Sequence, residues 1–125
     1  MKQLFLSAGI IICLLITACS KKNDAVTPIH SIQVDASAAS AYNIKVSTVK
    51  FGLSTEAIVD TKTGLTAAYQ YNISLEQGDK IIVEIKSNTE NTISYSIEDN
   101  GTSKVVVSNK QVNTFSTTIS EYTAQ

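Results

Sequence analysis

The residues of this chain that are best placed for chemistry are Cys19 and the three residues before it, Ile16, Thr17 and Ala18. Small residues such as Thr17 and Ala18 are what a signal peptidase needs at its cleavage site. The whole pattern resembles a bacterial lipobox. In that motif the thiol is alkylated by a diacylglyceryl group, the chain is cut before the cysteine, and the new amine is acylated. We therefore predict that Cys19 is lipidated.

The segment that precedes Cys19 has the organisation of a signal peptide. Lys2 supplies a positive charge, and an apolar run of thirteen residues follows from Leu4 to Ile16. A spanning helix needs about 20 apolar residues, so this run is too short to remain in the membrane. We expect residues 1–18 to be a lipoprotein signal peptide that is removed. An uncleaved N-terminal anchor is the alternative.

The composition of residues 19–125 excludes some classes of protein. They contain nine lysines, no arginine and eleven acidic residues, all scattered singly or in pairs. Without a basic stripe, nucleic-acid binding is disfavoured. Cys13 leaves with the signal and Cys19 takes the lipid, so no disulfide is expected. Because Ser20 rather than an aspartate follows the cysteine, we expect a lipid anchor in the outer membrane, facing the periplasm or the cell surface.

The chain beyond Cys19 divides into two parts by its hydrophobic pattern. Residues 19–41 have few large apolar side chains and are expected to be a lipid-anchored flexible tether. Ile32 and Val34 leave open a short first strand within residues 29–34. From Tyr42 onward apolar and polar residues alternate, so residues 42–125 are expected to form one β-domain.

The longest alternation predicts a half-buried strand or a strand bent between two sheets. Its six apolar positions are Leu65, Ala67, Tyr69, Tyr71, Ile73 and Leu75. A phase slip predicts a bulge near Ser47-Thr48, and residues 60–64 predict a turn. No helical pattern follows the signal. We expect an all-β, immunoglobulin-like antiparallel sandwich of about seven strands.

Two further expectations concern the core and a hairpin. The predicted core includes Ile73, Ile81, Val83, Ile93 and Tyr95. A two-residue loop at Asn100-Gly101 would pair Ile97 with Lys104, placing polar groups on the apolar face. A three-residue loop with Gly101 at positive φ would pair Tyr95 with Val105, and this is the loop that we predict. Phe115, Thr117 and Ile119 are expected in the last strand.

Few residues have side chains suited to catalysis or metal binding. His30 is the single histidine and lies in the expected tether, so it is predicted to be a surface or linker residue without a catalytic base role. Glu56, Asp60 and Asp99 are expected to be solvated turn residues rather than calcium ligands. We predict no enzymatic activity, no metal and no cofactor. Tyr69, Tyr71 and Tyr95 are expected in the core with hydroxyls at its rim, whereas Tyr42 and Tyr122 are left open.

Three segments resemble the MmpS family, small membrane-anchored accessory proteins of mycobacterial lipid and siderophore exporters. They are Tyr42-Asn43-Ile44-Lys45-Val46, the stretch from Ala57 through Asp60 to Gly64, and Thr92 through Gly101, which resembles that family's strand and hairpin. The chain lacks the family's Pro-Trp pair and disulfide cysteines, and has Cys19 in place of a transmembrane helix. The resemblance implies an immunoglobulin-like sandwich and an export pump as partner.

Together these features predict a non-catalytic interaction module tethered to a membrane through Cys19. Its partner is expected to be a protein of the cell envelope, whose identity the sequence does not specify. The alternative is a lipoprotein that binds a small ligand or a glycan. The signal and the residues around Cys19 also resemble those of many short lipoproteins of Gram-negative bacteria.

Overall fold

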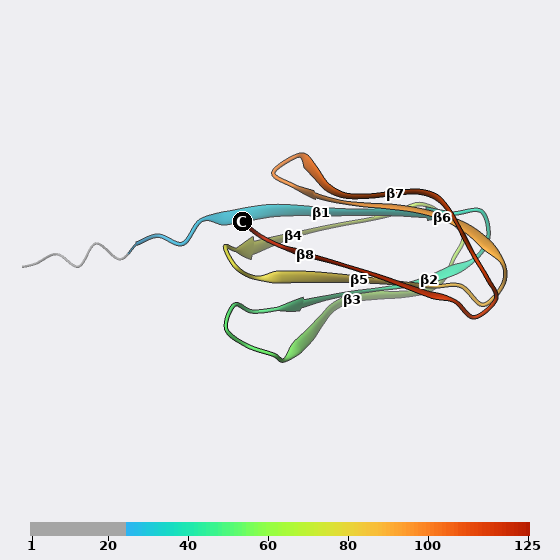
Figure 1. The fold of residues 1–125 in the computed structure, drawn as a ribbon, viewed down its shortest axis with the longest axis horizontal. Coiled ribbons are helices and arrows are strands. Elements are labelled where there is room, and N and C mark those ends of the chain that lie inside the picture. Colours follow the sequence, from blue (N-terminus) through green and yellow to red (C-terminus); the bar gives the residue numbers. More distant parts are fainter. Residues whose placement is uncertain (1–24) are drawn as a thin grey trace, which may run out of the picture.

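The computed structural model describes residues 25–125, which form eight β-strands and no helix. All strand pairs are antiparallel, and the strands form two sheets of four, shown in Figure 1. The first sheet has the order β4-β1-β6-β7 and the second has the order β3-β2-β5-β8. The strands are β1 (Ile29–Ala38), β2 (Tyr42–Val49), β3 (Glu56–Leu65), β4 (Tyr69–Glu76), β5 (Lys80–Lys86), β6 (Asn91–Asp99), β7 (Thr102–Val112) and β8 (Thr117–Thr123).

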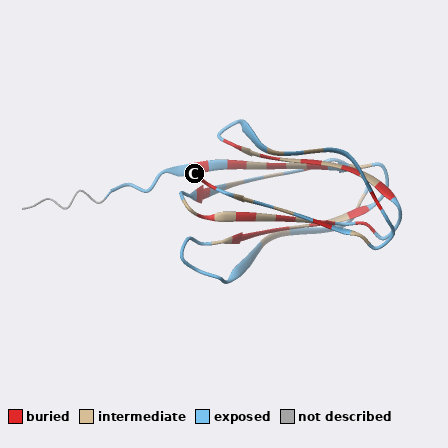
Figure 2. Ribbon diagram, viewed as in Figure 1, coloured by how far each residue is buried: buried red, intermediate tan, exposed pale blue. Residues whose placement is uncertain are grey.

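The predicted all-β sandwich is confirmed, with its core between the two sheets. Buried residues alternate with partly buried or exposed ones along β1, β2, β5 and β6, whereas β3 and β7 are largely exposed (Figure 2). Only β2–β3 and β6–β7 are hairpins within one sheet, and the other connections cross between sheets. The four-plus-four arrangement differs from the four-plus-three of immunoglobulin constant domains. The completely buried residues include Ile32, Val34, Val46, Ile81 and Ile97.

The strand that raises the total to eight is β1, and it corrects the expected tether over residues 19–41. Residues 29–38 form β1, which lies between β4 and β6 in the middle of the first sheet. Ile32 and Val34 are wholly buried, so this strand supplies part of the core. The polar residues between them face outward, which is why the segment resembles a tether when only its composition is considered. The sandwich therefore begins at Ile29 rather than at Tyr42.

The long alternation from Leu65 to Leu75 passes between the two sheets, one of the two arrangements predicted. Leu65 ends β3 in the second sheet, and Tyr69 begins β4 in the first. The predicted turn at residues 60–64 is wrong, because these residues continue β3. Gly64 has a φ of +64° at a shift of the β2–β3 register, where a glycine avoids strain.

The bulge predicted near Ser47-Thr48 occurs as a register shift between Val46 and Ser47 in the pairing of β2 with β3. Val46 pairs with Asp60 and Ser47 pairs with Ile58, so the extra residue is Val59 on the partner strand. The pairing of β2 with β5 stays regular on the other side. The bulge is therefore confined to the edge of the sheet.

The hairpin between β6 and β7 differs from the predicted three-residue loop. Asp99 pairs with Thr102, and Asn100 and Gly101 form a two-residue loop with φ values of +50° and +75°. A register shift then leaves Lys104 as an extra residue, so that Ile97 pairs with Val105. In a regular ladder the two-residue loop would pair Ile97 with Lys104 and place a polar group on the apolar face. The bulge at Lys104 avoids this pairing, because Ile97 then pairs with the apolar Val105.

Most of the predicted core is confirmed, but two details are corrected. Ile81, Val83, Ile93 and Tyr95 are buried, whereas Ile73 is only partly buried and packs against the edge of the core. The last strand exists as β8, but the two apolar residues expected in it do not join the core. Thr118 is buried and Ile119 is 58% exposed, and Phe115 lies before the strand with 72% exposure.

All five tyrosines link the two sheets through their hydroxyl groups. Tyr69, Tyr71 and Tyr95 are predicted to place their hydroxyls at the rim of the core, and each of these hydroxyls reaches a partner on the opposite sheet. Tyr42 and Tyr122, for which the sequence leaves the position open, do the same. Each such hydrogen bond contributes about 1 kcal/mol to stability. Residues 25–125 contain no cysteine, so these hydrogen bonds, and not a disulfide, supplement the core in joining the two sheets. The pairs are Tyr42 with the carbonyl of Ala36, Tyr69 with Asp60, Tyr71 with the carbonyl of Val59, Tyr95 with Ser120, and Tyr122 with Asp99.

The sandwich has two ends, which we name by the loops that they contain. The linker end comprises residues 25–28, 50–55, 77–79, 100–101 and 124–125, and the far end comprises residues 39–41, 66–68, 87–90 and 113–116. Backbone hydrogen bonds tie the linker end together. They join Gln77 to Pro28, Gly78 to Ala124, and Asn100 to Ser31.

Candidate functional site

The predicted lipidation site, Cys19, lies outside the described residues, as do the signal peptide and the first part of the tether. Its role stays a prediction. Residues 25–125 contain no helix that is long and apolar enough to cross a membrane. The described part of the chain offers four places to examine for function: a buried cluster around His30, a second cluster around Asp79, a trough on the first sheet and the outer face of the second sheet.

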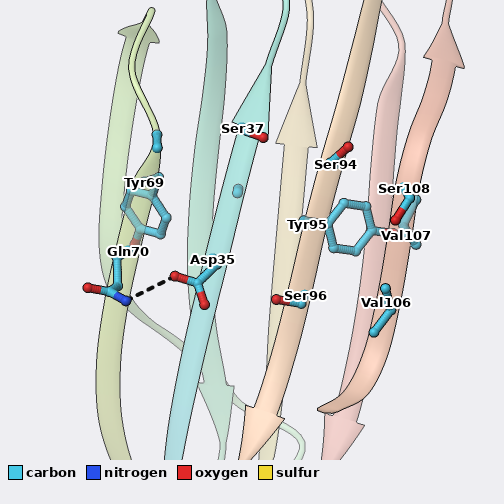
Figure 3. A pocket seen from close by; sticks show the side chains of 12 residues that line it. Asp35, Ser37, Tyr69, Gln70, Ser94, Tyr95, Ser96, Val106, Val107 and Ser108 are labelled. Carbon is cyan, nitrogen blue, oxygen red and sulfur yellow. Dashed lines mark hydrogen bonds between the residues drawn. The ribbon is translucent and has the colours of Figure 1, made fainter.

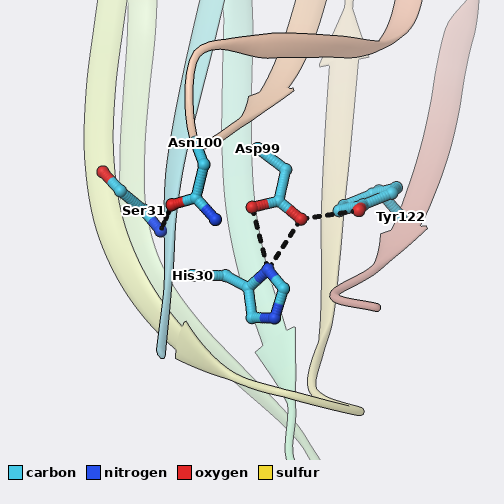
Figure 4. A network of polar contacts seen from close by, with 5 residues as sticks. All are labelled: His30, Ser31, Asp99, Asn100 and Tyr122. Atoms are coloured by element: carbon cyan, nitrogen blue, oxygen red, sulfur yellow. Dashed lines mark hydrogen bonds and ion pairs between the residues drawn. The ribbon is translucent and has the colours of Figure 1, made fainter. Parts of the chain in front are cut away.

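His30 is a buried part of a polar cluster near the linker end, which corrects its predicted place on a linker. Its Nδ1 donates to the two carboxylate oxygens of Asp99 at 2.9 and 2.8 Å, and the hydroxyl of Tyr122 donates to the same carboxylate at 2.7 Å (Figure 4). His30 and Asp99 are only 7% and 5% exposed. The three residues come from β1, β6 and β8, so the cluster connects the two sheets.

The electrostatics of this cluster favour an ionised Asp99. Burial alone would raise its pKa, but hydrogen bonds from Tyr122 and His30 outweigh burial and lower the pKa below its usual value. Burial, followed by the hydrogen bond to Asp99, raises the pKa of Tyr122 to about 12. An Asp–His pair orients a catalytic base only when the histidine also reaches a nucleophile. Among the described residues the ring of His30 hydrogen-bonds to Asp99 alone, which is typical of a structural pair.

A second buried carboxylate, Asp79, organises the adjacent turn at the linker end. It accepts hydrogen bonds from Lys50 Nζ at 2.7 Å and from the backbone amides of Phe51 at 2.9 Å and Glu76 at 3.2 Å. Burial would raise the pKa of Asp79, but these contacts lower it. Asp79 thereby joins the β2–β3 loop to the β4–β5 turn, so its contacts indicate a structural role.

The three acidic residues considered as calcium ligands do not form a common site. Asp60 accepts from Tyr69, whose hydrogen bond lowers the pKa of Asp60 most strongly, and it pairs with Lys62 at 3.2 Å. Glu56 instead faces Lys45 at 3.7 Å. Asp99 is committed to His30 and Tyr122. Within residues 25–125 no group of three or more His, Cys, Asp or Glu side chains is arranged to hold a metal ion.

A shallow trough of about 480 Å³ lies on the first sheet, and most of its polar lining points outward. Asp35 on β1 accepts a hydrogen bond from Gln70 on β4 at 3.1 Å, and small hydroxyl side chains line the rest of the trough, on β1, β6 and β7 (Figure 3). These hydroxyls belong to Ser37, Ser94, Ser96 and Ser108. The trough could accept a polyhydroxylated ligand by hydrogen bonding, but it is open to solvent rather than enclosed.

The outer face of the second sheet has the opposite character, because four aliphatic side chains lie on it. We call Val49, Ile58, Ile82 and Ile119 the aliphatic face. Ile58 and Ile119 are 63% and 58% exposed, and Val49 and Ile82 are partly buried. Ile58 and Ile82 flank Ser47 in the strand register, and its hydroxyl is buried without a hydrogen-bond partner.

Charged pairs alternate with the side chains of the aliphatic face. In the strand register Glu84 lies beside Ile119, and Glu121 lies beside Ile82. Lys45 Nζ lies 2.9 Å from Glu84, and Lys80 Nζ lies 3.0 Å from Glu121, so these charges are paired. The outer face of the second sheet is therefore a mixture of aliphatic side chains and neutralised charges.

No protein-family model matches the chain, and the curated proteins give no match. The resemblance to the MmpS family therefore stays an expectation.

Sequence reasoning did not identify the His30–Asp99–Tyr122 cluster or the aliphatic face. The cluster joins residues that lie 69 and 23 positions apart, and no local pattern connects them. The aliphatic face had one visible signal, because Ile82 interrupts the polar side of its strand. Ile119 is predicted in the last strand, but no pattern in the sequence indicates that it lies on the same outer face as Ile58 and Ile82.

Proposed function

We propose that this chain is a non-catalytic lipoprotein of the bacterial cell envelope that docks onto a protein partner through the aliphatic face. One observation carries the proposal: exposed Ile58 and Ile119 lie with Ile82 on the outer surface of a sheet, and Ile58 and Ile82 flank the buried hydroxyl of Ser47, which has no hydrogen-bond partner. Single exposed aliphatic side chains are ordinary on a monomer, whereas several that gather on one face are a feature of surfaces that contact a partner.

The anchor places this face at a membrane. The motif that ends in Cys19 supports lipidation, and Ser20 after it favours the outer membrane over retention in the inner one. A diacylglyceryl group with a third acyl chain anchors stably, because one chain alone binds only marginally. By its resemblance to the MmpS family, an export system is the first candidate partner.

Photo-crosslinking in living cells tests the docking face. A photoreactive residue is placed at Ile58 or Ile119, and the control is placed at Val106, which is equally exposed at 63% on the outer face of the first sheet. We expect both test positions to capture the same envelope protein, which the control does not capture. Capture should also be lost in an Ile82→Asp variant that keeps its melting temperature. Equal capture from all three positions would contradict the proposal.

A second function is supported by the trough around Asp35. Carboxylate and serine hydroxyl groups on a flat sheet suit the hydrogen-bonding groups of a glycan. An array of envelope glycans should then raise the melting temperature of the protein in a saturable way, and Asp35→Ala should abolish that rise. Ile58→Ala is the matched control on the opposite face and should leave the rise unchanged.

A further inference from the structure

We infer that the linker end of the sandwich rests on the lipid bilayer, inserting Phe51 and Leu53 into its surface. The inference rests on the proposed lipid anchor at Cys19 and goes beyond it, because an anchor alone leaves the orientation of the domain free. It assigns a membrane-contacting surface to a loop that takes no part in the core.

Exposed apolar side chains gather at this end of the molecule. Phe51 is 79% exposed and Leu53 is 64% exposed in the β2–β3 loop. Val26 and Ile29, on the chain that enters the domain here, are 90% and 59% exposed. The far end presents one large exposed hydrophobic side chain among the described residues, Phe115. A water-facing loop gains nothing by exposing a phenylalanine next to a leucine, whereas a bilayer surface buries both.

The loop that carries Phe51 and Leu53 is held in a defined shape. Leu53 donates its amide to the carbonyl of Lys50 at 3.0 Å, and Gly52 between them has a φ of +77°. This is the geometry of a type II turn, which requires glycine at that position. The amide of Phe51 is tied to Asp79, and its ring covers Gly78 so closely that an added Cβ would lie 2.7 Å from it. The two side chains are therefore presented by an ordered loop.

The length of the linker brings this end to the membrane. Nine residues, 20–28, separate Cys19 from Ile29 at the start of β1. Such a linker spans at most about 30 Å when extended and about 17 Å as a flexible coil. A ten-residue strand such as β1 is about 33 Å long, so the linker is too short to let the far end approach the bilayer easily. The β2–β3 loop, which carries Phe51, and the start of β1 both lie at the linker end (Figure 1).

Charge does not oppose this contact. Lys50 and Asp79 neutralise each other at 2.7 Å, and Asp99 is only 5% exposed, with its carboxylate hydrogen-bonded to His30 and Tyr122. Two exposed acidic residues lie beside the loop, Glu76 at the end of β4 and Glu56 at the start of β3, and Glu56 is paired with Lys45 at 3.7 Å. Lys21 and Lys22 follow the lipidated cysteine in sequence and would offset the charge of Glu76 at an anionic surface.

Single-tryptophan fluorescence tests the inference, because the chain contains no tryptophan. Phe51→Trp is compared with Phe115→Trp, an exposed phenylalanine at the opposite end. Both proteins are produced at full length in a lipoprotein-processing bacterium and placed in phosphatidylcholine vesicles that contain lipid spin-labelled near the headgroup. Mass spectrometry of the mature chain reports lipidation at Cys19 separately, and circular dichroism reports folding. Leu53→Trp serves as a second probe in case Phe51→Trp disturbs the contact with Gly78.

We expect several-fold stronger quenching and a blue-shifted emission for tryptophan at 51 and at 53, and solvent-like emission at 115. Equal quenching at both ends, or none at either, in a chain that carries the lipid would overturn the inference and leave the anchor intact. A mature chain without lipid on Cys19 would overturn the anchor, and with it the inference.

Discussion

The middle of the sandwich and its linker end hold the two sheets together in different ways. In the middle, wholly buried side chains such as Val34, Val46 and Ile97 meet without polar partners. At the linker end, Asp99 and Asp79 are buried as well, but each accepts several hydrogen bonds. The partners of Asp99 lie on β1 and β8, and the partners of Asp79 include Lys50 and Phe51 in the β2–β3 loop. The middle needs only residues that are apolar and of suitable size, whereas the end needs particular partners at particular distances.

The largest effect should come from the middle. Ile97→Ala removes a completely buried side chain and leaves a cavity, so we expect the free energy of unfolding to fall by about 2–5 kcal/mol. The matched control is Ile119→Ala, the same change at a residue that is 58% exposed. Its free energy of unfolding should fall by less than about 0.5 kcal/mol. Chemical denaturation measures both values. Similar losses would mean that the two faces of the sheets do not differ as described.

A smaller effect is expected at the linker end. Asp99→Ala removes the acceptor of both His30 and Tyr122, and leaving those buried donors unpaired should cost about 1–3 kcal/mol. Asp35→Ala is the control, because Asp35 faces outward in the trough on the first sheet. If the control lost as much stability as Asp99→Ala, the cluster would not be a specific linkage between the sheets.

The pH dependence of stability should separate the two regions further. The pKa values of Asp79 and Asp99 are lowered in the folded state, so their stabilisation is complete above about pH 4, the usual pKa of an aspartate. It is lost as the pH falls through the lowered pKa values. We expect the melting temperature to fall on acidification below about pH 4, with a shallower fall in Asp99→Asn. Ile97→Val, which changes only the apolar middle, should keep the steeper dependence of the unmodified chain.

How far prediction succeeded depended on whether a pattern was local. Alternation identified the buried faces of β5 and β6, because side chains on a strand point to opposite sides at every second residue. For β1 it left open a short strand over residues 29–34 through Ile32 and Val34, but residues 19–41 are expected to be a tether, because a polar outward face and small alanines conceal a ten-residue central strand. Alternation failed for β8, where the polar Thr118 is buried and the apolar Ile119 is exposed, the reverse of what their hydrophobicity indicates.

The hairpin and the polar clusters show the limit of local reasoning more clearly. The sequence offered two loops at Asn100-Gly101, and the preferred one assumed a regular ladder. The chain instead takes the short loop and inserts Lys104 as a bulge, which depends on how β7 pairs with the whole of β6. His30 was assigned to a linker because nothing near it in the sequence is a partner, whereas Asp99 lies 69 residues away.

By itself the sequence determined that this protein is all-β and what its N-terminal motif predicts, because both depend on the spacing of neighbouring residues. Only the tertiary structure decided which strands share a sheet, which carboxylates are buried, and where the aliphatic face and the exposed Phe51 loop lie. These features join residues far apart in the chain, and their energies depend on distances that folding alone establishes. The alternation of side chains is written into each strand, but the partner of each strand is chosen by the packing of the whole sandwich.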